Sequence, residues 1–217
     1  MKARNDQNSE WLTVTKPTEQ KYKMSFSTGG LFVNESVEVA RIHVRGERWE
    51  STIKRAMDEG ATALPKSASN RRTLREISNR LLTLSDEERA FFVDEADRSD
   101  QQALLWLATC RAYRFIREFA IEVIRERYLS YQYELPLESF DILLDAKAEW
   151  DQGLASLSQS TRAKLRQILF RMMREAGIIS QNGQIQAALL SVRLRTMIED
   201  RVPGDLAVFP GMAVDGA

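Results

Sequence analysis

The stretch SQSTRAKLRQILFRMMREAGIISQNGQIQAALLSVRLR, residues 158–195, decides which fold this chain is expected to adopt. Its first half has apolar residues at helical spacing, and Gly177 follows as a typical glycine after a helix C-terminus. Asn182-Gly183 is then the strongest short signal for a β-hairpin. The stretch holds one acid, Glu175, and seven basic residues: Arg162, Lys164, Arg166, Arg171, Arg174, Arg193 and Arg195. A basic helix followed by a short hairpin predicts a winged-helix-like element that contacts nucleic acid.

A helical wheel divides the predicted basic helix into two faces. One face gathers Leu165, Ile168, Leu169, Met172 and Ala176, and the other gathers Ala163, Gln167, Phe170, Arg171 and Arg174, flanked by Lys164 and Arg166. The charged face is expected to enter the major groove and to contact phosphates, since arginine binds phosphate and guanine in a bidentate manner. The hairpin residues Gln181, Asn182 and Gln184, with Arg193 and Arg195 beyond them, complete this predicted site.

Two alternatives weigh against this interpretation. A basic stripe on a helix is usually only its solvated face, and Phe170 on that stripe is expected to be buried against another part of the chain. A second basic patch, which includes Arg71 and Arg72, either extends the nucleic-acid surface or is compensated by the acidic segments 86–100 and 134–151. That patch consists of Lys66, Arg71, Arg72, Arg75 and Arg80, balanced there only by Glu76.

The bulk composition is that of an ordinary globular protein. The chain has 217 residues, 43% hydrophobic and 29% charged, with 31 basic and 31 acidic side chains. Zero formal net charge means that any nucleic-acid site must be a local patch. The single cysteine, Cys110, lies in an apolar run that is far shorter than the ~20 residues of a membrane span. Residues 1–20 are polar and lack the apolar core of a signal peptide. We therefore expect a cytoplasmic protein without membrane contact.

The pattern along the chain predicts a mainly α fold, a helical bundle with the winged-helix-like element at its C-terminal side. We divide it into an N-terminal tail (1–20), a helical domain (21–132), a winged-helix-like basic subdomain (133–202) and a C-terminal extension (203–217). Helices are expected over 34–44, capped by Asn34, over 70–83, after a capping box at Ser85–Glu88, within 101–128, after Pro136, over 158–176 and over 191–201. Residues 203–217, punctuated by glycine and proline, are expected to be extended.

Catalytic and metal-binding patterns are mostly missing. His43 and Cys110 are the only histidine and cysteine, and they are far apart in the sequence, which is a poor basis for nucleophilic catalysis and excludes a structural zinc site. Gly29-Gly30 lacks the further residues of a nucleotide-binding loop. A carboxylate-only metal site stays open, although Asp141, Asp145 and Glu149 read as a solvated helix face. We expect a protein that is not an enzyme and has no cofactor or bound metal.

Several motifs of the chain match one known family: YKMSFSTGGLF (22–32) with Asn34-Glu-Ser36, LLWLA (104–108), RAYRFIREFA (111–120), AKAEW (146–150) and STRAKLRQILFRMMREAG (160–177). In these motifs the chain resembles the BrxA family, small components of bacterial BREX phage-resistance systems. Together they span about residues 22–200. The resemblance implies a cytoplasmic, non-enzymatic, mainly helical accessory protein that acts beside other BREX proteins. It also implies a helical core like that of antitermination factors. Residues before Lys21 and after Pro203 lie outside it.

Three functions follow as hypotheses. The first is an accessory factor for phage defence that binds double-stranded DNA with low sequence specificity, because arginines dominate the predicted site and few neutral base-reading residues accompany them. The second is an adaptor whose charged faces dock other BREX proteins. The third is an RNA-binding protein, in line with the antitermination-like comparison.

Overall fold

The computed structural model describes residues 21–60, 62 and 68–213, and its regular structure there is helical. This confirms the expected mainly α fold. The helices are α1 (Val33–Ile42), α2 (Trp49–Glu59), α3 (Ala68–Leu81), α4 (Asp86–Asp94), α5 (Arg98–Ala112), α6 (Arg114–Glu118), the π-helix η1 (Phe119–Arg125), α7 (Glu126–Leu129), α8 (Glu138–Ala148), α9 (Gln152–Ala155), α10 (Gln159–Glu175), α11 (Val192–Arg201) and the 3-10 helix η2 (Pro203–Val208).

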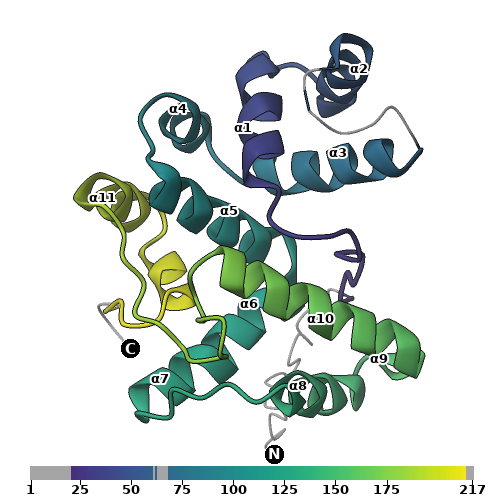
Figure 1. The fold of residues 1–217 in the computed structure, drawn as a ribbon, viewed down its shortest axis with the longest axis vertical. Coiled ribbons are helices and arrows are strands. Elements are labelled where there is room, and N and C mark those ends of the chain that lie inside the picture. The colour runs from purple at the N-terminus through teal and green to yellow at the C-terminus, as the bar shows by residue number, and fades with distance from the viewer. Residues whose placement is uncertain (1–20, 61, 63–67, 214–217) are drawn as a thin grey trace, which may run out of the picture.

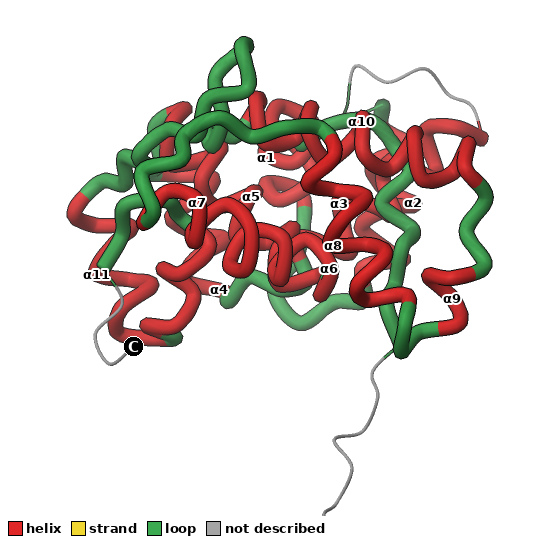
Figure 2. The backbone as a smooth tube through the Cα atoms, turned by 90° about the horizontal axis from the view of Figure 1, so that it is seen from below, coloured by secondary structure: helices red, strands yellow, loops and turns green. Residues whose placement is uncertain are grey.

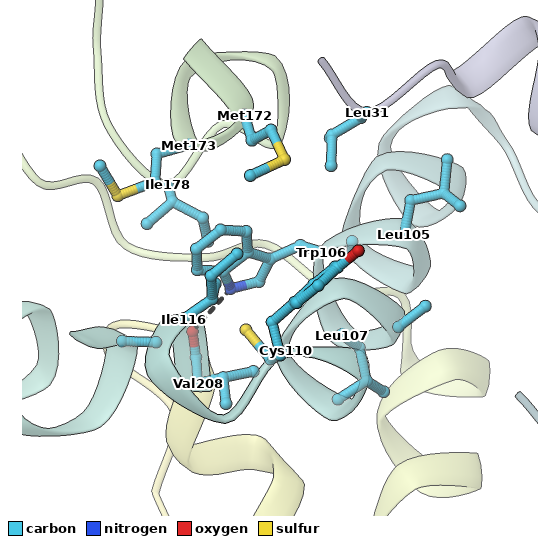
Figure 3. Close-up of a cluster of buried hydrophobic side chains, with 14 of the residues drawn as sticks. Leu31, Leu105, Trp106, Leu107, Cys110, Ile116, Met172, Met173, Ile178 and Val208 are labelled. Carbon is cyan, nitrogen blue, oxygen red and sulfur yellow. Dashed lines mark hydrogen bonds between the residues drawn. The ribbon is translucent and has the colours of Figure 1, made fainter. Parts of the chain in front are cut away.

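Helix α5 forms the centre of the fold (Figure 1). It packs against α1, α3, α4, α10 and η2, and every residue from Ala103 to Cys110 is buried. A helix that is apolar on all sides is stable only when neighbours cover it completely. Figure 3 shows the fully buried Trp106 in this core, where its indole N–H donates to the Val208 carbonyl at 2.9 Å.

The segment 101–128 is helical as expected, except at one residue. Tyr113 adopts an extended conformation (φ −129°, ψ 101°) and separates α5 from the run α6–η1–α7. Its hydroxyl donates to Glu76 Oε2 on α3 at 2.5 Å, and the side chain is completely buried. The helix break at Tyr113 has no glycine or proline beside it in the sequence. It coincides instead with the long-range hydrogen bond from Tyr113 to Glu76.

Several helix ends follow local sequence rules. Ser85 and Glu88 form the predicted capping box of α4, and the Ser158 side chain caps α10 by accepting from the Thr161 N–H. We expected Asn34 to cap α1, and this prediction is wrong. The residue before α1 is Phe32, with a left-handed backbone, while Asn34 accepts a hydrogen bond from Arg98 on α5.

The predicted β-hairpin, and with it the winged-helix element, is not supported: no strand is found in the part of the chain that the structure describes. Only two isolated bridges occur near the turn, Ile179 with Ile185 and Glu134 with Gln184. The two arms of the turn still share hydrogen bonds, because the Ser180 N–H donates to Gln184 and the Gln186 N–H donates to Ile178. On its other edge the returning arm pairs with residues 133–135, where the Ile185 N–H donates to Tyr133 and the Leu135 N–H donates to Gly183. Each pairing is too short to form a regular strand. Gly183 has φ 78° and closes a turn on Ser180.

The segment after α11 is not extended, contrary to our expectation. Residues 203–208 form η2, and Leu206, Val208 and Phe209 are buried in the same core as α5. Asp205, also buried, pairs with Arg111 Nε at 2.7 Å and with Arg117 Nη1 at 2.5 Å. The last described segment is therefore an integral part of the packing. The division of the chain into four parts stays a prediction, and residues 1–20 lie outside the described part.

Gly30 and Leu31 join α3 to α10. The Gly30 carbonyl accepts from Arg80 on α3 at 2.9 Å, and the Leu31 N–H donates to Glu175 on α10 at 2.6 Å. A Cβ atom on Gly30 would overlap the Glu175 carboxylate, so a larger residue here would displace that side chain from its hydrogen bond with the Leu31 N–H. Gly29-Gly30 thus has the structural role that the sequence favoured over nucleotide binding.

Within the described residues, no helix has the length and apolar character needed to pass through a bilayer.

Candidate nucleic-acid interface

Helix α10 has a buried face and a charged face. Leu165, Leu169, Met172 and Met173 are nearly inaccessible. Phe170 is 2% exposed and contacts the Phe119 ring, which confirms that it is buried. The opposite side carries Lys164, Gln167, Arg171 and Arg174, spaced three or four residues apart on one side of the helix. We call these four residues the α10 row. Figure 2 shows α10 near the upper side of the molecule in this view, and α8 and α6 lie below it, toward the middle of the molecule.

Two predicted contact residues on α10 are engaged by the acidic helix α8. Arg162 pairs with Asp145 at 2.6 Å, and Arg166 pairs with Asp141. This is the intramolecular compensation that the sequence left open for the segment 134–151. It also gives Asp141 and Asp145 a structural role, and no cluster of metal-ligating side chains occurs among the described residues. Arg162 and Arg166 are therefore less available to bind phosphate than the sequence analysis predicted.

The α10 row keeps most of its charge. Neither Lys164 nor Arg174 has an ion-pair partner in the described part of the chain. Arg171 pairs with Glu175 one helical turn away at 2.8 Å, and its side chain is 63% exposed. An exposed pair of this kind is weak and leaves the guanidinium available to a phosphate. The row therefore presents three cations and one amide to solvent.

The residues of the predicted hairpin lie on the turn that replaces it. Gln181, Asn182 and Gln184 are exposed, and none of the three side chains makes a long-range hydrogen bond to another described residue. Beyond the turn, Arg193 is exposed near Glu87 and Glu95, at 4.0 and 3.9 Å. Arg195 pairs with Glu199 on its own helix at 2.7 Å. The two arginines of α11 are thus partly compensated by neighbouring acids.

The second basic patch divides into surface and interior. Arg71, Arg72 and Arg75 are exposed on α3 and have no ion pair among the described residues. Arg80, by contrast, is fully buried and pairs with Glu76 at 2.8 Å. Lys66 lies outside the described residues. Arg71 and Arg72 lie on α3, whereas the α10 row lies on α10, and each of these helices packs separately against α5. The two sets of cations therefore belong to different helices.

Sequence reasoning missed a buried polar network around Arg111. Its guanidinium contacts Glu88 at 2.8 Å and Asp205 at 2.7 Å. Burial alone would raise the pKa of Glu88, but hydrogen bonds from Arg111 and the Ser85 N–H outweigh it and hold the pKa below its usual range. The only available signal was the capping box, which marks Glu88 as a helix-end residue but not as a buried one.

The single histidine and the single cysteine do not meet. His43 stacks on Trp49 with ring centroids 3.8 Å apart, and burial lowers its pKa. Cys110 is buried, and burial raises the pKa of its thiol. A thiol with a raised pKa is a poor nucleophile at neutral pH. The two side chains line separate cavities, so they form no catalytic pair.

The class that the fold defines is that of mainly helical proteins, and one of its helices, α10, carries the cationic row. The family model described as BrxA matches residues 20–202, and the chain belongs to the BrxA family. It is similar to the BREX protein BrxA of Bacillus cereus (strain H3081.97), 23% identical over 180 residues, which cover 80% of this chain and 88% of that protein. In fold it is similar to the crystal structure of an uncharacterized protein from Magnetospirillum magneticum. That similarity has a TM-score of 0.74 and 19% identity, and it covers 87% of this chain and 97% of the other.

Proposed function

We propose that this protein is a non-enzymatic, DNA-binding accessory component of a BREX phage-defence system. It contacts double-stranded DNA through the α10 row with little sequence preference. Membership of the BrxA family supports the place in phage defence, as does the name of the Bacillus cereus relative. The observation that carries the DNA-binding part is the uncompensated charge of Lys164 and Arg174, on a helix whose other cations are paired.

The proposed contacts are with the phosphate backbone. Lys164, Arg171 and Arg174 would each bind a phosphate, and Gln167 between them would bind phosphate or a base edge. Gln181, Asn182 and Gln184 on the turn, with Arg71 and Arg72 on α3, are secondary contacts that a bent or longer duplex would reach. Arg162 and Arg166 contribute less, because carboxylates of α8 pair with them. Arg193 and Arg195 are secondary contacts, because they lie on α11 and not on the α10 row.

The triple variant Lys164→Ala/Arg171→Ala/Arg174→Ala tests this proposal. Each phosphate contact changes duplex affinity by about 0.9 log units per tenfold change in salt. We therefore expect the variant to bind a labelled duplex more than about a hundredfold more weakly than wild type at 0.1 M salt, measured by fluorescence anisotropy.

The matched control is Arg41→Ala/Arg48→Ala/Lys54→Ala, which removes the same charge. All three residues are exposed, and Arg41, like Arg171, has one ion pair on its own helix. The control is expected to bind nearly as wild type. Equal losses in the two triple variants would mean that only net charge matters, and the α10 row would no longer be assigned as the contact surface.

The adaptor function remains the second candidate, and one observation favours it. Leu189, just before α11, and Val192, its first residue, are each 84% exposed near Arg193. Exposed apolar side chains rimmed by charge are a feature of protein interfaces. Co-purification with another BREX protein that charge reversal abolishes, together with no DNA binding at any salt, would favour the adaptor. Competition between duplex DNA and structured RNA separates the RNA-binding alternative.

A further inference from the structure

A cleft lined by positive charge lies between the first described residues and the junction of α5 with α6. Its volume is about 560 Å³, and its lining contains Lys21, Lys23, Arg111, Arg114 and Arg117 together with Cys110 and Ala112. No carboxylate is among the lining residues. A concave surface whose charged lining groups are all cations concentrates positive potential and attracts anions. We call it the cationic cleft.

Buried acids hold part of this cleft rigid from behind. Asp205 pairs with both Arg111 and Arg117, and Glu88 pairs with Arg111. Arg114 is held by Glu118 at 2.6 Å. Five cations against these three carboxylates leave an excess of two charges. Guanidiniums that are already positioned lose little freedom when an anion binds.

The two lysines supply the excess charge. Lys21 and Lys23 are exposed and have no ion pair in the part of the chain that the structure describes. Lys23 lies over the Tyr113 ring at 5.6 Å. Both belong to the segment that crosses α6, where the Tyr22 hydroxyl donates to Glu118 and the Tyr22 N–H donates to Asp151. The lysines are thus attached to a fixed segment at the edge of the cleft.

A second cleft of about 520 Å³ continues from the first, because Lys21 and Arg114 line both. Its other lining residues are Tyr22, Lys147, Trp150, Asp151, Gln152 and Gly153. The Asp151 carboxylate is occupied there, because it accepts from the N–H groups of Tyr22 and Leu154. Arg114 already covers the Tyr22 ring at 4.7 Å, whereas Trp150 is 75% exposed. An exposed indole beside a cationic groove is the arrangement that proteins use to stack single-stranded bases.

We propose that the two clefts form a binding site for single-stranded nucleic acid. Backbone phosphates lie in the cationic cleft, and an unpaired base stacks on Trp150. A base in a duplex is already stacked on its neighbours, so only a single-stranded segment can reach the indole face. No residue of α10 lines either cleft, so this site does not depend on the α10 row.

The test uses the full chain and a labelled ten-nucleotide oligothymidylate, with binding followed by fluorescence anisotropy. Trp150→Ala is expected to weaken binding about tenfold, since stacking of one base on an aromatic side chain contributes about that much. Lys21→Ala/Lys23→Ala is expected to weaken it by a similar factor or more. Both changes are at exposed side chains, and an unchanged circular dichroism spectrum of each variant shows that it is folded. Arg48→Ala/Lys54→Ala, at two exposed positions, serves as the charge control.

Each outcome decides the proposal. Oligothymidylate binding that survives in both cleft variants overturns it, and so does a loss seen only in the α10 triple variant. Thymidine monophosphate that competes as well as the oligonucleotide indicates a mononucleotide site and overturns the strand assignment. Loss of oligothymidylate binding in the cleft variants, with the circular dichroism spectrum unchanged, supports it. That result stands whether or not the α10 row binds duplex DNA.

Discussion

Replacing Glu76 with alanine is expected to lower the free energy of unfolding by about 3–5 kcal/mol, because it leaves a buried arginine without its counter-charge. Arg80 is fully buried, and Glu76 accepts from its Nε at 2.9 Å. The other carboxylate oxygen of Glu76 accepts from the Tyr113 hydroxyl. One side chain thus satisfies two buried partners on different parts of the fold. Urea unfolding followed by circular dichroism measures the effect.

Two further variants define the cause of that loss. Arg75→Ala, at an exposed site on the same helix, is expected to change the stability by no more than about 0.5 kcal/mol. Glu76→Gln keeps a hydrogen-bond acceptor but removes the charge, so its effect should fall between the other two. A Glu76→Ala protein within about 1 kcal/mol of wild type would show that Arg80 finds another partner and that the pair does not hold α3 in place.

Phe209→Ala is expected to cost about 3–5 kcal/mol, the usual range for removing a buried phenyl ring from a packed core. Phe209 is 1% exposed and follows Val208, whose carbonyl accepts from Trp106. The substitution therefore tests whether the segment after α11 is part of the core. Thermal and urea unfolding both report it.

The neighbouring exposed position provides the comparison. Val202 is 41% exposed, and Val202→Ala is expected to be close to neutral. If the two variants were equally stable, the last described segment would be only loosely attached, and the buried pairs of Asp205 would need another explanation.

The elements that could be predicted from sequence are those whose signals are local. The capping box at Ser85 and Glu88, the cap at Ser158 and the buried stripe of α10 follow from residues three or four positions apart. The features that could not be predicted depend on distant partners. Tyr113 interrupts the helical run and donates a hydrogen bond to Glu76 on α3, and the chain after the turn at Gly183 pairs with residues 133–135 as well as with the arm before the turn. The Asn182-Gly183 signal predicts a turn correctly but not the ladder beside it.

The candidate site shows the same limit. The sequence indicated a basic helix, and α10 is that helix. It could not show that α8 supplies carboxylates to Arg162 and Arg166 while Lys164 and Arg174 stay unpaired. Nor could it show that Arg80 is interior or that Lys21, Lys23 and Arg114 share a cleft. Charge along the chain predicts a patch, but the packing of neighbouring helices decides which charges remain free.

The most direct test of DNA binding by the α10 row is the salt dependence of duplex affinity. For wild type we expect log affinity to fall with log salt with a slope of about −4 to −6, at about −0.9 for each phosphate contacted. In Lys164→Ala/Arg171→Ala/Arg174→Ala the slope should be shallower by about 2 to 3, and in Arg41→Ala/Arg48→Ala/Lys54→Ala it should match wild type. The same slope in all three proteins, or no binding by wild type at low salt, would contradict the account.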